Sequence, residues 1–391
     1  MMQFRFGQLA LVTAMAVLTS GLFGLPWTIA AAQSLSTDRP ASPHGWLIPI
    51  DPGPRGGPAG AGGPLTGVGA SDEQLFAAAK SRFREVDSVS GSVPGETGIG
   101  LGPRFNLNSC AGCHAFPAAG GSSPPTNPQV AVAKLDGARN VVPSFITTTG
   151  PVRVARFVRN RDGTPDGGVY DLFVISGRTD APGCTITQPD FAAALAQNNV
   201  IFRIPTPLFG LGLVENVPDS SLEADQAANS PLMASLGSRR KFNRSANDGT
   251  ITRFGWKAQN KSLLMFASEA YNVEIGVANE LFPNERDDIP SCLFNPLPED
   301  ATNLSDSDAS GVPASAYSSD IVNFAAFMRL AAGPTPAPPT ASTTHGQQVF
   351  SDTGCNLCHI PQHATGKSIF TNQSSVTFSP FSDFALHDMG A

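Results

Sequence analysis

The sequence has few charged residues and no excess of basic ones. Only 15% of its 391 residues are Asp, Glu, Lys or Arg, and 32 acidic against 25 basic residues give a formal net charge of −7. This balance argues against a general nucleic-acid binder, because such a protein needs positive charge to meet the phosphate backbone. Hydrophobic residues make up 41% of the chain, which excludes intrinsic disorder. The length instead suggests two or three domains, each large enough to bury a core.

Long apolar runs are absent except near the N-terminus. Arg5 is the single charge in the first 32 residues, and an apolar stretch over 9–25 leads to three alanines before Gln33. This order is typical of a secretory signal peptide with its small-residue cleavage site. An uncleaved membrane anchor is the alternative, because the stretch is close to the shortest that spans a bilayer. We expect cleavage, and therefore an exported, periplasmic protein without a stable membrane span.

Glycine and proline are abundant and divide the chain. Its 39 glycines and 34 prolines exceed the usual share, so much of the chain must lie in turns and loops. After the signal peptide at 1–32, we expect a Gly/Pro-rich arm over 33–70 and a Pro-rich linker over 334–344. These stretches separate a first domain at 71–333 from a second at 345–391.

Apolar spacing predicts where regular elements form. A helix is expected to begin at Ser71, where Gln74 completes a capping box, with apolar side chains on one face. Alternating patterns predict two strands, at 152–158 and 169–175, joined by a turn. Further elements are expected as a strand at 200–204 and as helices at 262–278, 319–330 and 346–351.

Four of the six cysteines form two copies of the pattern C-x-x-C-H. The copies consist of Cys110, Cys113 and His114, and of Cys355, Cys358 and His359. This spacing is typical of covalent c-type haem attachment, because two thiols three positions apart can add to both vinyl groups of one porphyrin. The adjacent histidine then supplies the proximal ligand to the iron. The sequence therefore predicts two haems c.

Other uses of these cysteines fit less well. A thioredoxin-like pair belongs at a strand-to-helix turn of an α/β unit, and a zinc ribbon needs its two pairs close together. Here the two motifs are 245 positions apart (359 − 114 = 245). The remaining Cys184 and Cys292 are expected to form a structural disulfide in an oxidising compartment, with a lone reactive thiol as the alternative.

The expected fold is mainly α, with two cytochrome c-like haem domains. The first domain carries a long insertion that is partly β and rich in loops. Only 32 residues follow His359 (391 − 359 = 32), which leaves little room for a closing helix over the second haem. We therefore expect the second domain to be incomplete and the sequence to be truncated at its C-terminus.

Several longer stretches resemble the di-haem oxidoreductase family, whose members are also labelled peroxidases or thiol oxidoreductases. These stretches are GLGPRFN at 100–106, TPLFGLGLVE at 206–215, RFGWKAQ at 253–259 and the ending at 383–390. The family is related to bacterial di-haem cytochrome c peroxidases, and the likeness covers about residues 70–391. Family members continue further and carry a second Pro-Leu-x-Gly-Leu-Gly copy, which this sequence lacks.

The resemblance implies further functional residues. In the peroxidase relatives one haem stores an electron while the other meets hydrogen peroxide, a tryptophan lies between them, and a calcium ion often sits nearby. Trp256 is the matching tryptophan, with a core role as the alternative. Glu215 is a candidate acid for O–O cleavage, with a solvated surface position as the alternative. The label thiol oxidoreductase has no support here, because the paired cysteines are expected to be bound to haem.

The distal iron ligands stay open in the sequence. No histidine lies between His114 and His345, so the first iron is either open or bound by Met233, Met265, Met328, a tyrosine or His345. For the second iron, His387 and Met389 are weak candidates. In the relatives the matching His-x-x-Gly follows the haem as a structural element or one on the side of the propionates. His363 is expected at the surface.

These observations favour an exported di-haem c-type cytochrome that acts as a peroxidase-like oxidoreductase. Electrons would arrive from a small periplasmic donor, a cytochrome c or a cupredoxin, and reach a small-molecule oxidant at an open iron. The protein would supply ligands, burial and hydrogen bonds. A non-enzymatic electron carrier and a haem-based sensor of a small ligand are the alternatives.

Overall fold

The computed structural model describes residues 60–391, apart from 167, 288, 296–297, 304–317 and 388–391. Contacts divide the chain into two units, Met1–Gly57 and Pro58–Ala391, and all described residues belong to the second. The predicted signal peptide and most of the predicted arm therefore lie outside the described residues. In the part of the chain that the structure describes, no helix is both long and apolar enough to cross a bilayer.

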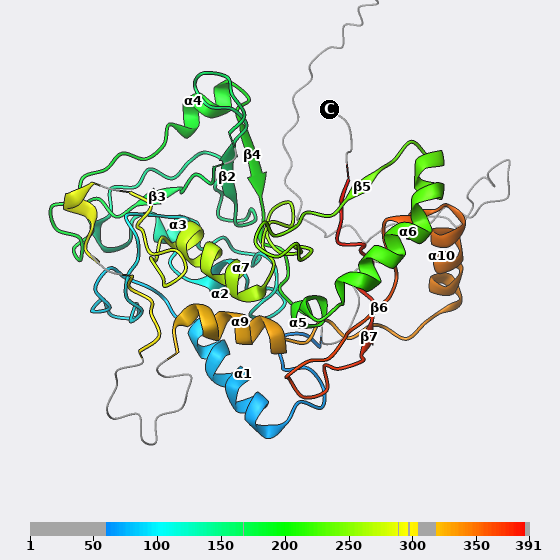
Figure 1. The fold of residues 1–391 in the computed structure, drawn as a ribbon. Coiled ribbons are helices and arrows are strands. Elements are labelled where there is room, and N and C mark those ends of the chain that lie inside the picture. Colours follow the sequence, from blue (N-terminus) through cyan, green and yellow to red (C-terminus); the bar gives the residue numbers. More distant parts are fainter. Residues whose placement is uncertain (1–59, 167, 288, 296–297, 304–317, 388–391) are drawn as a thin grey trace, which may run out of the picture. The chain divides into compact units, whose positions relative to one another are not determined.

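Helices and short strands alternate with long loops, and helices are the main regular structure (Figure 1). The α-helices are α1 (Ala70–Phe83), α2 (Cys110–Cys113), α3 (Gln129–Val132), α4 (Phe191–Ala196), α5 (Leu211–Glu215), α6 (Asp219–Ser235), α7 (Leu263–Ala270), α9 (Asp320–Leu330) and α10 (Ala341–Asp352). A π-helical turn, η2 (Tyr271–Ile275), continues α7. Single 3₁₀ turns are η1 (Leu135–Gly137), η3 (Pro290–Cys292) and η4 (Cys355–Leu357).

The strands form antiparallel pairs and no larger sheet among the described residues. The pairs are β1 (Arg104–Phe105) with β3 (Phe173–Val174), β2 (Val154–Phe157) with β4 (Val200–Arg203), β5 (Arg240–Lys241) with β8 (Leu386–His387), and β6 (His363–Ala364) with β7 (Thr377–Phe378). The observed architecture is mainly α, as predicted, with a few short strands.

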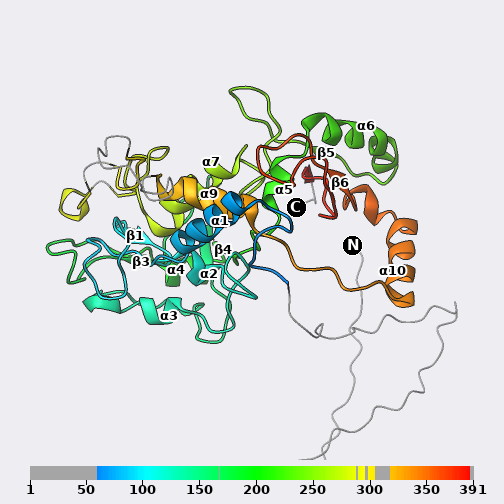
Figure 2. The same cartoon turned by 90° about the horizontal axis from the view of Figure 1, so that it is seen from below.

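The core forms where α9 lies between α1 and α7, as both views show (Figure 1, Figure 2). Apolar residues cover most of α9, so it is buried on several sides rather than along one stripe. Phe327 on α9 contacts two phenylalanines of α1, with ring centroids 4.5 Å from Phe83 and 5.6 Å from Phe76. α5 approaches the end of α9 closely, because a Cβ on Gly212 would lie 2.1 Å from the Arg329 carbonyl oxygen. Only glycine fits there.

Most predicted elements are present, but three details of the prediction are wrong. Gly69, with no side-chain cap, precedes α1, so Ser71 lies inside the helix and forms no capping box. β2 forms its ladder with β4, and it meets the 169–175 segment only through a bridge between Ala155 and Tyr170. α10 begins within the predicted linker, because Thr340 and Thr343 form a reciprocal capping box.

The segment after α10 is tied to the preceding chain by hydrogen bonds. The Gln373 side chain donates to the Arg329 carbonyl oxygen at 2.9 Å, and the Gly366 N–H donates to the Asn216 carbonyl at 2.8 Å. His363 is 5% exposed, and its Nε2 lies 2.8 Å from the Ser382 carbonyl oxygen. The expectation of a surface position for His363 is therefore wrong.

Candidate functional site

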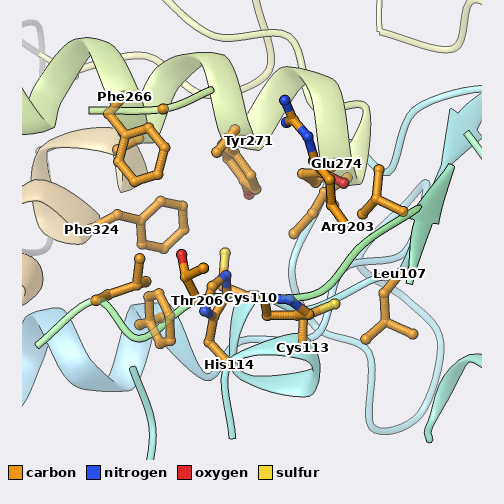
Figure 3. A pocket seen from close by; sticks show the side chains of 18 of the residues that line it. Leu107, Cys110, Cys113, His114, Arg203, Thr206, Phe266, Tyr271, Glu274 and Phe324 are labelled. Carbon is orange, nitrogen blue, oxygen red and sulfur yellow. The ribbon is translucent and has the colours of Figure 1, made fainter. Parts of the chain in front are cut away.

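A cavity of about 550 Å³ lies above the first C-x-x-C-H motif. This volume is within the range of ligand pockets, about 300–1,000 Å³. One wall carries Cys110, Cys113 and His114 from α2 and its C-terminal end, and the opposite wall carries Tyr271 and Glu274 from η2 (Figure 3). Apolar side chains, among them Phe83, Leu107, Phe266 and Phe324, fill most of the remaining surface.

His114 is oriented by a backbone contact. Its Nδ1 lies 2.9 Å from the Gly121 carbonyl oxygen, so Nδ1 carries the proton and Nε2 keeps its lone pair for a ligand. Burial lowers the pKa of the imidazole, against the opposing effect of backbone contacts at Gly121 and Thr206. A neutral imidazole fixed in this tautomer is the form that binds iron.

The two thiols of the first motif are free and protonated. Burial is the main cause that raises the pKa of both Cys110 and Cys113 far above the usual range of thiols. Two thiols and one imidazole on the same cavity wall are the donors that covalent haem attachment needs. The chemistry of this wall therefore fits a c-type haem.

A buried guanidinium gives a second test of that fit. Arg203, at the end of β4, lines the cavity, and its Nε and Nη2 atoms are buried without a hydrogen-bond partner. Its guanidinium lies 3.7 Å from the ring centroid of Trp256, and burial, followed by the charge of Arg156, lowers its pKa to about 10. Unpaired buried N–H groups are costly, and a haem carries two carboxylates that could accept from them.

Glu274 is the acid of the opposite wall. Its Oε2 accepts a hydrogen bond from Asn106 Nδ2 at 2.8 Å, and burial raises its pKa, although Asn106 and three arginines oppose the shift. The π-helical turn brings Tyr271, Glu274 and Ile275 to the same cavity. Such turns are frequent at functional sites.

Of the two catalytic residues predicted from the sequence, one lines this cavity and the other does not. Trp256 lines it and is 43% exposed. Glu215 is not among the lining residues, since its oxygens accept from Arg329 at 2.6 and 3.1 Å and from the Leu263 N–H at 2.7 Å. These contacts join α5, α9 and α7, and they give Glu215 a structural role.

The sequence does not decide among several candidate distal ligands for the first iron. Met328, which is 2% exposed, and Tyr271 line the cavity. Met233, Met265 and His345 are not among the lining residues.

The second motif has the same donors in a more exposed setting. Cys355 and His359 are exposed, and no residue of α10 is buried. His359 Nδ1 lies 3.1 Å from the Phe381 carbonyl oxygen, which again leaves Nε2 for a ligand. The donors fit a second c-type haem, and the Asp383 N–H fixes the motif by donating to the Cys358 carbonyl oxygen at 3.1 Å.

Neither predicted distal ligand of the second iron gains support. His387 Nε2 lies 3.0 Å from Asp383 Oδ2, and Arg240 donates to the same carboxylate at 2.9 Å. His387, on β8, is therefore held by a hydrogen bond to a carboxylate that also pairs with Arg240. Met389 lies outside the described residues.

Calcium also stays a prediction. Within the described ranges, no three His, Cys, Asp or Glu side chains come together in a group that could hold a metal ion.

Cys184 and Cys292 are joined by a disulfide with an S–S distance of 2.11 Å, and both side chains are buried.

Sequence reasoning missed the residues of the opposite wall. Glu274 and Arg203 belong to no recognisable motif and lie far along the chain from Cys110, and Tyr271 was expected only as an unspecified tyrosine among the candidate distal ligands. The three-residue spacing of Tyr271 and Glu274 within the predicted helix was the one available signal, because residues three apart share a helix face.

Comparisons with known proteins give one match. Residues 155–391 match the family described as "Di-haem oxidoreductase, putative peroxidase". The matched region contains the second C-x-x-C-H motif, and the first lies before it. No curated protein and no solved structure matches the chain significantly. Because the family match covers more than half of the chain, this protein belongs to the di-haem oxidoreductase family.

Proposed function

We propose that the protein is an exported di-haem c-type cytochrome that reduces a small-molecule oxidant, of the hydroperoxide class, in the cavity above His114. A haem held by Cys110, Cys113 and His114 would supply the redox chemistry. The observation that carries the proposal is the arrangement of Glu274 and Arg203 across the cavity from these ligands.

Reduction of a hydroperoxide consumes two electrons and two protons and yields an alcohol and water. Glu274 can hold one of these protons, because burial raises its pKa and the Asn106 contact occupies only Oε2. Arg203 can stabilise negative charge in the cavity, since its guanidinium N–H groups are unpaired and desolvated. The mostly apolar lining offers few other partners to a polar group, so Glu274 and Arg203 are the charged side chains that a bound oxidant would meet.

The second motif suits the entry of electrons. Electron transfer needs close approach of a partner, and the exposed Cys355 and His359 would allow a small cytochrome c or cupredoxin to come near a haem bound there. We propose a cytochrome c-like setting for each haem, with Trp256 as a residue on the way between them. Its place in the cavity wall, under Arg203, is compatible with this role.

A non-enzymatic electron carrier is the second candidate. Met328 is buried and lines the same cavity, so its thioether could cap the first iron and leave no room for an oxidant.

Absorption spectra of the full-length holoprotein as isolated, reduced, and reduced with CO separate these functions. The proposal expects one high-spin haem in two that binds CO, followed by turnover of a hydroperoxide. Two low-spin haems that ignore CO would establish the electron carrier. CO binding without turnover would support a ligand sensor.

A matched pair of variants then tests the role of Glu274. Glu274→Gln keeps an oxygen that accepts from Asn106 but cannot supply a proton, so turnover should fall by roughly 10²-fold while CO binding persists. Glu73→Gln, on the exposed side of α1, serves as the control and should keep full turnover. Equal rates in the two variants would contradict the role of Glu274.

Export has its own measurement. A mature N-terminus at Gln33, read by mass spectrometry of the secreted protein, is expected. An intact leader on a membrane-bound product would contradict cleavage.

A further inference from the structure

A group of buried carboxyls lies directly behind the haem cavity. Asp87 is 3% exposed, Asp300 is 8% exposed, and Asp320 begins α9 with a side chain that is 19% exposed. All three carboxyls act on the pKa of Tyr271, and Asp87 and Asp320 also act on that of Cys110. The group borders the cavity through Tyr271, which lines it and donates a hydrogen bond to Asp320.

Tyr271 is the side chain that connects this group to the cavity. It is 3% exposed, its side chain extends from η2 into the cavity toward Cys110 (Figure 3), and its hydroxyl donates to Asp320 Oδ2 at 3.5 Å. Phe324 fixes the ring by an edge-to-face contact at 5.0 Å. The phenol therefore has its ring in the cavity wall and its hydroxyl at a carboxylate.

Asp320 in turn reaches the surface. Its Oδ1 lies 3.5 Å from Arg82 Nε, and Arg82 is 39% exposed and also pairs with Glu85 at 2.8 Å. Asp300 has a different role. Its carboxylate oxygens accept hydrogen bonds from the N–H groups of Asp320 and Ile321 at 2.6 and 3.1 Å and so cap α9. Asp320 is therefore the carboxyl of this group that is both partly exposed to solvent and hydrogen-bonded to Tyr271.

We propose that Asp320 and Tyr271 form the route by which protons from solvent enter the haem cavity. The inference rests on the proposed function, which consumes two protons for each hydroperoxide. In each transfer the Tyr271 O–H bond breaks and its proton passes to an oxygen of the hydroperoxide in the cavity, while protonated Asp320 gives its proton to the phenolic oxygen, and solvent then reprotonates Asp320. No electron moves along this route.

The protonation equilibria match these roles. Burial, followed by the charge of Asp300, raises the pKa of Asp320 to about 7, although Arg82 opposes the shift. A carboxyl that is half protonated near neutral pH accepts and gives protons with equal ease. Burial and the charge of Asp87 raise the pKa of Tyr271 well above its usual value, so the phenol rests in its protonated form.

Other charged groups lie around Asp320, and the variants used to test the route must leave these groups unchanged. Arg82 and Glu85 approach Asp320 from α1 and the residues after it, Asp87 and Asp300 from loops, and Tyr271 from η2. Asp87 is nearly fully buried and cannot take up protons from solvent. Its charge affects the pKa of the groups on the route, but it does not carry protons to them.

Asp320→Asn and Tyr271→Phe in the holoprotein test the route. Both keep side-chain shape, and Asp300 still caps α9 in each. Hydroperoxide turnover should fall by roughly 10²-fold in either variant, and the double variant should be no slower than the singles because the two groups act in series. A small diffusible weak acid such as formic acid should restore part of the rate of Asp320→Asn.

Glu285→Gln is the matched control. Burial, followed by the charge of Glu299, raises the pKa of Glu285 to about 7 as well, but Glu285 does not line the cavity. This variant should keep full turnover. Loss of turnover in Glu285→Gln equal to that in Asp320→Asn would overturn the route, because the effect would then follow from any buried carboxyl.

Infrared spectroscopy provides a readout that does not depend on turnover. Release of CO from the reduced holoprotein by light should shift a carboxyl C=O band, and Asp320→Asn should abolish this shift while Glu285→Gln preserves it. Tyr271→Phe should move the band, because the carboxyl loses its hydrogen-bond partner. An unchanged carboxyl band in Asp320→Asn would overturn the route.

The outcomes separate this route from the proposed function. If the parent protein turns over hydroperoxides and Asp320→Asn does so equally fast, the route is wrong and the function stands. If the parent protein is inert, the function is wrong, and the infrared shift decides whether the carboxyl and the cavity are coupled. A change of haem spin state in Tyr271→Phe would make Tyr271 an iron ligand and overturn its role in the route.

Discussion

Replacing Glu215 by alanine is expected to destabilise the protein and to leave the chemistry of the haem cavity intact. Charge-assisted hydrogen bonds contribute about 1.5–3 kcal/mol each. The side chains of Glu215 and Arg329 are 18% and 24% exposed, so solvent screening reduces their pair to about 2 kcal/mol. Loss of the acceptor for the Leu263 N–H adds about 1 kcal/mol. We therefore expect the free energy of unfolding to fall by about 3 kcal/mol.

This loss converts into a measurable change of melting temperature. The unit Pro58–Ala391 has 334 residues (391 − 57 = 334), and an unfolding entropy of about 2.1 cal/mol/K per residue gives about 0.7 kcal/mol per degree. Calorimetry of the holoprotein should then show Tm lower by about 4 °C. The CO difference spectrum and the hydroperoxide turnover per folded molecule should not change.

Glu223→Ala is the control for the same measurement. Glu223 pairs with Arg244 at 2.7 Å, but these side chains are 50% and 43% exposed, so the loss should stay below about 1 kcal/mol. A variant Glu215→Ala that melts like the parent and yet loses turnover would refute this reasoning and restore Glu215 as a catalytic acid.

Three further predictions concern the disulfide, a buried carboxyl and Arg203. Replacing both Cys184 and Cys292 by serine opens a loop of 108 positions and should lower the free energy of unfolding by about 4.7 kcal/mol in urea titrations; a loss below about 1 kcal/mol would contradict this. Glu285 has a folded pKa of about 7 against a usual 4.5, so the folded state binds more protons between these values and its stabilising contribution is lost as pH rises through that window. Glu285→Gln should therefore raise Tm at pH 7.5 and not at pH 4.5, and equal effects at the two pH values would disprove the assignment. Arg203→Gln removes a buried positive charge from the cavity, which should lower the reduction potential of the first haem in a spectroelectrochemical titration; an unchanged potential would show that the guanidinium does not face the haem.

The helices could be predicted because their signals are local. The apolar spacing in 262–278 and 319–330 locates α7 with η2 and α9 to within a few residues. Caps were less predictable: Ser71 has the right chemistry for a cap, but the helix begins one residue earlier, after Gly69. The capping signal at Thr340 was hidden by the neighbouring prolines.

Strand pairing could not be derived from the same pattern. The turn residues at 160–163 favour a hairpin between neighbouring strands, whereas β2 pairs with β4, more than forty positions away. Pairing is decided by which side chains pack on each face, and that depends on distant segments. At β4 the ring of Phe202 packs on Phe145, with centroids 4.6 Å apart.

In the candidate site, too, the local motif could be predicted, whereas the residues that packing brings to it could not. Cys110, Cys113 and His114 form a contiguous pattern that is typical of c-type haem attachment, so the motif is visible without a structure. Glu274 and Arg203 meet this motif only through the packing of η2 and β4, and their residue types are common on protein surfaces. Their importance becomes visible when burial leaves Arg203 unpaired and raises the pKa of Glu274.

The two motifs have identical donors in different surroundings. Each histidine directs Nδ1 to a backbone carbonyl, of Gly121 in the first motif and of Phe381 in the second. Around the first, a mostly apolar cavity carries an acid and is connected through Tyr271 to Asp320, while the thiol and imidazole of the second are exposed. Cleavage of an O–O bond needs protons and exclusion of water, whereas electron entry needs only close approach. These different surroundings are the basis for our proposal that chemistry takes place at the first motif and electrons enter at the second.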